Sequence, residues 1–202
     1  MPNPCKHYKH LSLRLDELRR KFLEKELCKE AQDPCTFDPD LDCIAAFKLL
    51  FHAEIEIFLE EKAKERIVQI ESAISSNLPW QRDNPQIFAM QSLLCCGDPL
   101  PPKFDHGDLS ARLKALLGKA KAKIAENNGI KEASFVALSL IAGKTTEELS
   151  STITATLNSF GSERGEIAHK SVPRTRVMNG PSVESATATD IVKELGIYFD
   201  VV

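Results

Sequence analysis

Residues 41–75 read LDCIAAFKLLFHAEIEIFLEEKAKERIVQIESAIS, and this stretch decides the fold. We predict one long helix here, because a break with two prolines precedes it at residues 33–40 and Asn77-Leu-Pro79 ends it. Residues 44–59 are apolar nearly all round, which is typical of a helix that other helices surround. Residues 60–66 are a run of charged side chains that favours solvent. We therefore expect the central helix of a bundle, most deeply buried over its first half.

Further helices are predicted on both sides of this one. Apolar side chains recur at helical spacing over residues 8–29, opposite a charged face. The same reasoning predicts helices over residues 85–96, 108–127, 130–142, 145–160 and 187–198. Glycine occurs only 9 times, helix-forming residues dominate, and no series of strands is recognisable.

These segments predict an all-α protein, an up-and-down bundle of roughly four to five core helices. We expect a single domain over residues 1–202. Residues 78–107 are predicted to form a helical or loop insertion in it.

The bulk properties exclude several classes of protein. The formal net charge is -3, so any nucleic acid must be bound through a local basic patch. The first seven residues contain no apolar signal-peptide core, and there is no run of about 18 apolar residues, so we expect a cytoplasmic protein without a membrane span. The 6 cysteines are then expected to be reduced. No Cys or His spacing typical of a metal site occurs, and no metal or other cofactor is expected.

The segment Arg164-Gly-Glu-Ile-Ala-His169 joins the two side chains that metal-free RNA cleavage needs. A histidine can move a proton near neutral pH, and an arginine can clamp a phosphate with two parallel hydrogen bonds. We expect Ser162 to cap a helix that begins at Glu163, so that free N–H groups of its first turn also face a phosphate. Three cations follow and form the predicted RNA-binding patch: Lys170, Arg174 and Arg176.

The two motif side chains do not share a face of one regular helix. At about 100° per residue, positions 164 and 169 lie roughly 140° apart. Arg164 could reach around from a loosened first turn next to Gly161 and Gly165. Alternatively, two copies of the chain could meet across a two-fold axis and place both motifs in one cleft. A surface arginine and histidine without a catalytic role fit the same spacing.

The motif resembles the Arg-x(4–6)-His signature of the HEPN superfamily, small helical proteins of which many are ribonucleases. Residues 45–60 resemble the central helix of its RNase-like branch, in which a glutamate precedes an aromatic residue by two, as in Glu56-Ile-Phe58. Residues 190–200 are similar to the last helix of the superfamily.

The resemblance implies a four- or five-helix bundle, usually a homodimer, that cleaves RNA internally without a metal. It implies that His169 transfers protons and that Arg164 stabilises the phosphate. Gly165 departs from the family pattern, in which Asn, Asp or His often follows the arginine. Ser171 stands where some toxin members carry a tyrosine, so regulation through such a tyrosine is not implied.

Three carboxylates are candidates for supporting Arg164. Glu163 precedes it directly. A helical wheel places Glu54 among apolar side chains, where a carboxylate must be paired, whereas Glu56 shares a more polar stripe with Lys48 and His52. The family resemblance favours Glu56 and the wheel favours Glu54. We expect a structural ion pair from whichever is not near the motif, and we interpret His52 as an ordinary helix-face residue.

Two functions remain open. The first is a metal-independent endoribonuclease acting at a homodimer cleft, a toxin or antiviral defence effector with a neutralising partner protein. The second is a non-catalytic dimer module that binds nucleotide, RNA or a partner protein. The complete motif and its trailing cations favour the first, whereas Gly165 and the acidic total charge favour the second.

Overall fold

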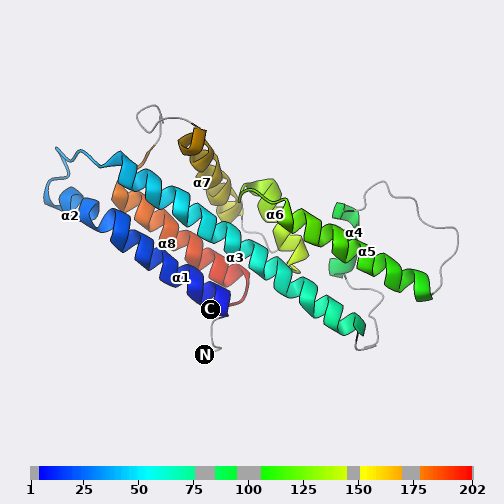
Figure 1. Ribbon diagram of the computed structural model, residues 1–202. Helices are drawn as coiled ribbons and strands as arrows, with labels where there is room; N and C mark the ends of the chain where they lie inside the picture. Colours follow the sequence, from blue (N-terminus) through cyan, green and yellow to red (C-terminus); the bar gives the residue numbers. More distant parts are fainter. Residues whose placement is uncertain (1–4, 76–84, 95–105, 145–150, 170–177, 202) are drawn as a thin grey trace. The chain divides into compact units, whose positions relative to one another are not determined.

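The computed structural model describes residues 5–75, 85–94, 106–144, 151–169 and 178–201 (Figure 1). Every regular element in these ranges is helical, with no strand, which confirms the predicted all-α fold. The chain divides into two compact units. Unit 1 comprises Met1–Phe58, Gly129–Glu132 and Leu149–Val202, and unit 2 comprises Leu59–Asn128 and Ala133–Glu148.

The predicted N-terminal helix is present but has a π-helical turn in its middle. It consists of three successive parts: α1 (Lys6–Leu18), the π-helix η1 (Arg19–Leu23) and α2 (Glu24–Gln32). Leu18 and Leu23 are both fully buried although they are five residues apart. Five residues would rotate a side chain roughly 140° around an α-helix, whereas the wider π turn keeps both leucines facing the core.

The long helix α3 (Leu41–Ser75) has the bounds that the sequence predicted. The Asp40 carboxylate accepts hydrogen bonds from the backbone N–H groups of Asp42 and Cys43, both at 3.1 Å, and so caps its first turn. Its first half is deeply buried, as expected, but not on every side: Leu50 and Ile57 are 42% and 49% exposed.

Helix α8 (Pro181–Tyr198) packs in unit 1 against α1, α2 and α7 (Ser151–His169). Aromatic side chains fill the core: Phe51 of α3 meets Phe160 of α7 edge-on at 5.9 Å between ring centroids. Phe58 of α3 meets Phe199, directly after α8, at 5.5 Å. These contacts give unit 1 the bundle architecture that the helical spacing predicted.

Helix α8 begins six residues before the predicted start at residue 187. Pro181 occupies its first turn, where a missing N–H costs nothing. The Glu30 carboxylate of α2 accepts hydrogen bonds from the backbone N–H and the hydroxyl of Ser182, at 3.0 and 2.9 Å. This cap comes from a residue 152 positions away, so the local sequence did not reveal it.

Unit 2 contains the second half of α3 and three shorter helices: α4 (Pro85–Leu94), α5 (His106–Ala125) and α6 (Glu132–Ile141, whose first residue is assigned to unit 1). The bounds of these three helices agree with the predicted ones to within two residues. Lys121 of α5 pairs with Glu71 of α3 at 2.6 Å. Gly143 adopts a φ of 95°, which suits the end of α6 and is the conformation that glycine tolerates best.

None of the described helices is long and apolar enough to cross a membrane. The cysteines in the described ranges, Cys5, Cys28, Cys35 and Cys43, all have free thiols.

A close contact between α8 and α1 gives a first prediction. A Cβ on Gly196 would lie 2.7 Å from the Tyr8 hydroxyl and 2.8 Å from ring carbons, so Gly196→Ala should force the helices apart. We expect it to lower the free energy of unfolding by about 1–3 kcal/mol in urea denaturation. Gly165→Ala is the matched control, because a Cβ there meets nothing within 4 Å, and it should stabilise by up to about 1 kcal/mol. Equal effects of the two changes would contradict the contact.

Candidate functional site

The Arg164–His169 motif lies in the second half of α7, which runs without a break from Ser151 to His169. The prediction that Ser162 caps a new helix at Glu163 is therefore wrong. Four buried side chains at helical spacing hold the whole segment to the core: Ile153, Leu157, Phe160 and Ile167. This stripe continues through the motif, so packing keeps the chain helical where glycine and serine suggested a boundary.

Gly161 is tolerated inside α7 because another segment passes close to it. A Cβ at this position would lie 3.1 Å from Cγ of Lys131 and 3.4 Å from a side-chain carbon of Ile130. The glycine thus serves the packing of residues 129–132 on α7 and does not begin a helix.

Because the motif lies in the second half of α7, it lacks the free N–H groups that were expected to help bind a phosphate. Free backbone N–H groups occur only in the first turn of a helix, and the first turn of α7 is more than two turns before Arg164. The C-terminal end of a helix carries the negative end of the dipole. Any phosphate binding must therefore come from the side chains of the motif and of its neighbours.

Arg164 is half-buried and faces His52 of α3, which is only 2% exposed. Arg164 forms no hydrogen bond or ion pair with another described side chain. Burial first, and the Arg164 cation second, lower the pKa of His52 from its ordinary value near 6.5 to about 4. His52 is consequently neutral at pH 7, so Arg164 is the only cation of this pair.

Glu56 completes a group that we name the Arg164 cluster: Arg164, His52 and Glu56. The Glu56 Oε2 atom lies 3.9 Å from Nδ1 of His52, one helical turn earlier on α3. That distance exceeds a hydrogen bond, and the buried Nδ1 atom has no hydrogen-bond partner. The sequence left Glu54 and Glu56 open as supports of Arg164. Glu56 is the one that lies beside His52, the neighbour of Arg164.

Glu54 belongs to a different contact. Its Oε1 atom accepts a hydrogen bond from Nε of Arg14 at 2.8 Å, and Nε2 of His10 lies 3.5 Å from its Oε2 atom. Both partners are on α1. As the wheel required, this largely buried carboxylate is paired, and it forms the structural ion pair expected of the glutamate away from the motif.

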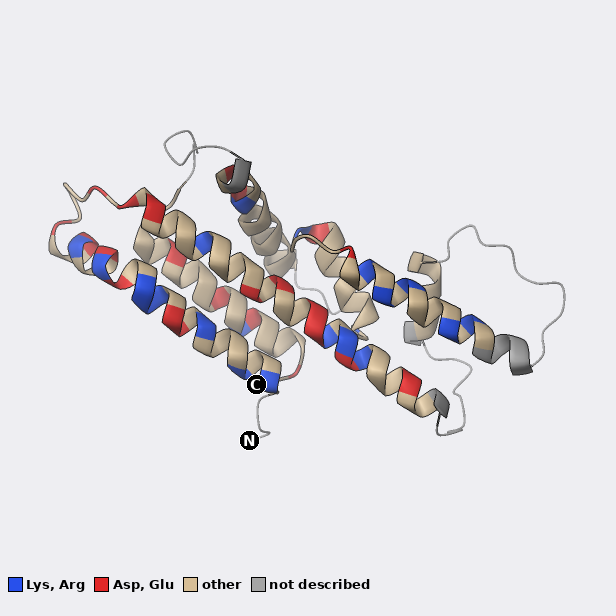
Figure 2. Ribbon diagram, in the orientation of Figure 1, with Lys and Arg blue, Asp and Glu red and all other residues tan. Residues whose placement is uncertain are grey.

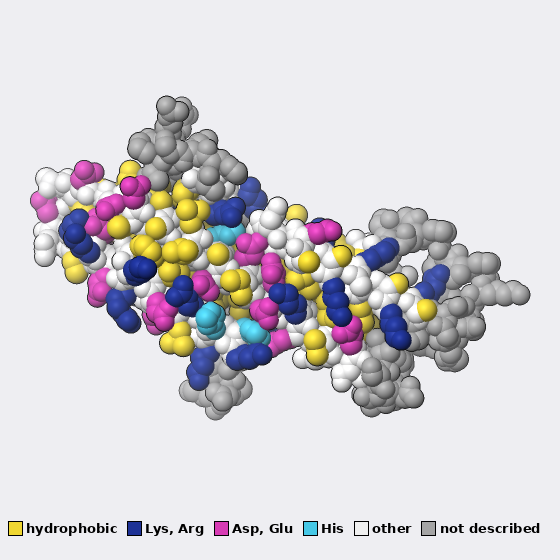
Figure 3. Space-filling model, viewed as in Figure 1, with side chains coloured by type: hydrophobic (Ala, Val, Ile, Leu, Met, Phe, Trp, Pro, Cys, Tyr) yellow, Lys and Arg dark blue, Asp and Glu magenta, His cyan; other side chains and the backbone are white. Residues whose placement is uncertain are grey.

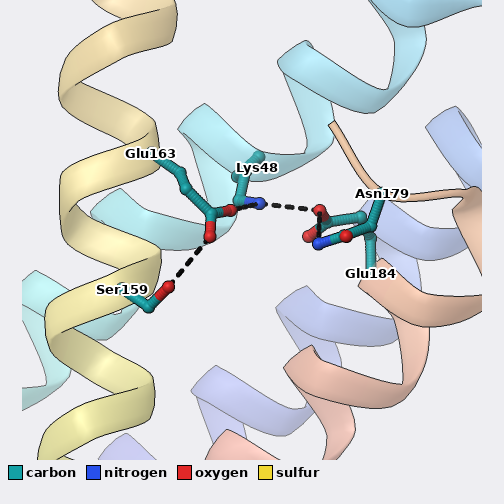
Figure 4. A network of polar contacts seen from close by, with 5 residues as sticks. All are labelled: Lys48, Ser159, Glu163, Asn179 and Glu184. Atoms are coloured by element: carbon teal, nitrogen blue, oxygen red, sulfur yellow. Dashed lines mark hydrogen bonds and ion pairs between the residues drawn. The ribbon is translucent and has the colours of Figure 1, made fainter. Parts of the chain in front are cut away.

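Glu163 is part of a buried network centred on Lys48 of α3, which is 1% exposed (Figure 4). The Lys48 ammonium binds the Glu163 carboxylate of α7 and, at 2.7 Å, the Glu184 carboxylate of α8. The Ser159 hydroxyl donates to Glu163 at 2.9 Å, and the Asn179 amide donates to Glu184 at 3.1 Å. Glu163 thus supports Arg164 by holding α7 on α3, and does so without contacting the guanidinium.

The polar stripe of α3 was the sequence signal for this arrangement, but its environment was not predicted. Lys48 and His52 are both almost fully buried, and they face Glu163 and Arg164 of α7. His52 lies on a face of α3, as interpreted, but this face is buried, and its imidazole lies in the interior beside the motif arginine.

Several predicted site residues remain untested by the structure. Lys170, Arg174 and Arg176 lie outside the described residues, as does the side chain of His169. Within the described ranges, no group of three or more His, Cys, Asp or Glu side chains is arranged to hold a metal ion.

Comparisons of the chain with protein-family models, with curated proteins and with solved structures found no match.

The Lys48 network gives a second prediction. Lys48→Met should lower the free energy of unfolding by about 3 kcal/mol or more, because it leaves the carboxylates of Glu163 and Glu184 without their buried cation. Lys64→Met is the matched control: it is on the same helix and also pairs with two glutamates, but is 49% exposed. We expect it to cost less than about 1 kcal/mol. A Lys48→Met cost no larger than that of the control, in thermal or urea unfolding, would contradict the network.

The low pKa of His52 gives a third prediction. Because the folded-state pKa of about 4 is below the ordinary value of 6.5, the unfolded chain takes up the proton first as the pH falls. The contribution of His52 to stability is present above pH 6.5 and is lost between pH 6.5 and 4. Wild type should lose up to about 3 kcal/mol more over this range than His52→Gln in urea denaturation at each pH, and equal losses would contradict the low pKa.

The contribution of Arg164 to this shift is separable. Arg164→Gln should raise the pKa of His52 towards 6.5 while burial still holds it below that value, as measured by NMR titration of the imidazole. An unchanged pKa in Arg164→Gln would show that the two side chains do not interact.

Proposed function

We propose that this protein is a metal-independent endoribonuclease whose reactive groups are Arg164 and His169. The observation that carries the proposal is the state of Arg164 in its cluster. Among the described residues of unit 1, the other cations that are not exposed are neutralised, Lys48 by two carboxylates and Arg14 by Glu54. Arg164 has no carboxylate bound to it among the described side chains. Its donors therefore remain available for a phosphate, which an arginine binds through two parallel hydrogen bonds.

In the proposed reaction, a base removes the proton of a ribose 2′-hydroxyl, and that oxygen attacks the adjacent phosphorus. The bond to the 5′-oxygen breaks, and this oxygen takes up a proton as it leaves. Arg164 binds the non-bridging oxygens while negative charge builds on them. The products are a 2′,3′-cyclic phosphate and a 5′-hydroxyl.

Proton transfer is assigned to His169. His52 has its pKa lowered to about 4, so it is neutral near pH 7 and lacks the imidazolium proton that a leaving oxygen would take up. A catalytic imidazole works best when its pKa is close to the working pH. His52 instead adds no second positive charge beside Arg164. In this cluster, the electrostatic attraction for a phosphate therefore comes from Arg164.

The continuous α7 helix favours a site built from two copies of the chain. The backbone is regular from Arg164 to His169, so the separation of roughly 140° around the helix applies. A loosened first turn, from which the arginine could reach around, does not exist at this position. We therefore propose a homodimer in which the arginine of one copy works with the histidine of the other.

This assignment rests on the resemblance of the motif to the HEPN superfamily, and so does its biological setting. We propose a toxin or antiviral defence effector that acts on RNA and is restrained by a neutralising partner protein.

A non-catalytic module that binds RNA, nucleotide or a partner protein is the second candidate. This candidate is favoured by the position of the motif in the second half of α7. The motif there has no access to the free N–H groups of a helix N-terminus. The same arginine would then hold a phosphate without cleaving RNA.

Cleavage of single-stranded RNA in the presence of EDTA is the fourth prediction and distinguishes the two functions. We expect the wild type to produce 2′,3′-cyclic phosphate ends, and His169→Ala to be slower by about 100-fold or more. Arg164→Ala should lose activity similarly, while exposed Arg20→Ala, which removes the same charge from unit 1, should keep it. Full activity in His169→Ala would rule out the proposed catalysis.

A mixing experiment tests the shared site. If arginine and histidine act across the dimer, equimolar Arg164→Ala and His169→Ala chains, unfolded and refolded together, should recover part of the activity. Recovery no greater than the sum of the separate variants would show that each copy uses its own pair.

A further inference from the structure

Helix α5 in unit 2 is a basic helix that has no part in the proposed cleavage site (Figure 2). From Ala111 to its end at Ala125 it carries no acidic residue. Its cations are Arg112, Lys114, Lys119, Lys121 and Lys123. Its buried side is lined by Leu113, Leu116, Leu117, Ala120 and Ile124. The basic character is therefore a property of the side of α5 that faces away from the core of unit 2.

The cations form two rows along the helix. At about 100° per residue, Arg112, Lys119 and Lys123 fall within roughly 40° of one another. Lys114 and Lys121 fall within roughly 20° of each other, on the opposite flank. The two rows are separated by roughly 160° across the exposed side, so each borders one edge of that surface.

From Ala111 to Ala125, where the structure describes the side chains of α5, only small residues occupy the surface between the two rows. Four of them, the exposed Ala111, Ala115, Gly118 and Ala122, form what we name the small-residue ridge. A Cβ added to Gly118 would meet nothing within 4 Å, so the ridge faces open space. A partner can therefore approach the backbone of α5 closely while lysines extend past it on both sides.

We infer that α5 docks on a nucleic-acid duplex, with its two rows of cations reaching phosphates of the two strands. Charge complementarity identifies the partner: cations on both flanks match the two lines of phosphates that border a groove. Alanine and glycine side chains have no donors or acceptors for base edges, so this docking is independent of base sequence. A membrane surface fits less well, because a helix that lies in lipid presents large apolar side chains.

The surroundings of α5 are consistent with such a partner. Figure 3 shows Lys and Arg side chains along α5, and Lys and Arg mixed with Asp and Glu over the second half of α3, on one face of unit 2. Lys121 pairs with Glu71 on the surface, where the two side chains are 55% and 42% exposed. Such exposed pairs are weak and screened by salt, so the lysine can exchange its carboxylate for a phosphate.

The docking does not rest on the proposed cleavage, and the experiment separates the two. Binding of a short fluorescent duplex is measured by anisotropy over a series of salt concentrations, with full-length chain carrying Arg164→Ala and His169→Ala to prevent turnover. Duplex RNA, duplex DNA and the corresponding single strands are compared. We expect both duplexes to bind more tightly than the single strands, since a single strand offers one line of phosphates.

Matched charge variants locate the surface. Lys114→Gln/Lys123→Gln removes one cation from each row, and we expect it to weaken duplex binding about tenfold. The slope of log K against the logarithm of the salt concentration should become shallower by about two. Lys25→Gln/Lys193→Gln removes the same charge from exposed positions of unit 1, and we expect less than a twofold change. Equal losses in the two double variants would overturn docking on α5 in favour of diffuse attraction.

A charge-neutral variant tests the ridge. Ala115→Leu/Ala122→Leu places bulk between the rows without altering charge and with little change in helix propensity, and circular dichroism checks that the fold is retained. We expect it to weaken duplex binding at least fivefold, and unchanged binding would overturn close approach of the helix. Equal affinity for single strands, or tighter binding to phosphatidylserine vesicles than to duplex, would overturn the assignment of the partner.

Discussion

The contact of Lys48 with Glu163 and Glu184 is the constraint on which the arrangement of unit 1 depends. An ammonium group that is 1% exposed must be neutralised, and its two carboxylates come from two other helices. Helices α7 and α8 can therefore take only positions that bring these carboxylates to α3. Two carboxylates around one ammonium leave a net negative charge, and Glu163, which is 23% exposed, is the one that water can still reach. This partial exposure reduces the cost of the excess charge.

The same contact determines the surroundings of the motif arginine. Glu163 directly precedes Arg164, so fixing one on Lys48 also fixes the direction of the other, towards His52 one turn along α3. A buried imidazole beside a cation is more stable neutral than charged, which is why the pKa of His52 falls so far. The structural network and the candidate site are thus neighbouring turns of the same pair of helices, and a change to one must disturb the other.

The sequence predicted the elements of this fold better than their surroundings. The bounds of α3 were predictable, because prolines and capping residues on both sides are local signals. The continuation of α7 past Phe160 was not, because Gly161 and Ser162 are local signs of a boundary, whereas Phe160 and Ile167 pack against distant parts of the chain. The burial of Lys48 was hidden for the same reason, since its partner Glu163 is 115 residues away. The need of Glu54 for a partner was predictable, but the identity of Arg14 was not.

The acidic total charge is likewise an average that conceals local differences. The net charge of -3 meant that any nucleic acid had to be bound through a local basic patch, and α5 carries five cations and is nearly free of acidic residues. Charges on a protein surface act over a Debye length of about 8 Å at physiological salt, which is shorter than the helix itself. A phosphate at α5 therefore responds mainly to the two rows beside it and little to distant glutamates. Partner chemistry follows the charge of a single surface, and the sum over a chain with two compact units is a poor guide to it.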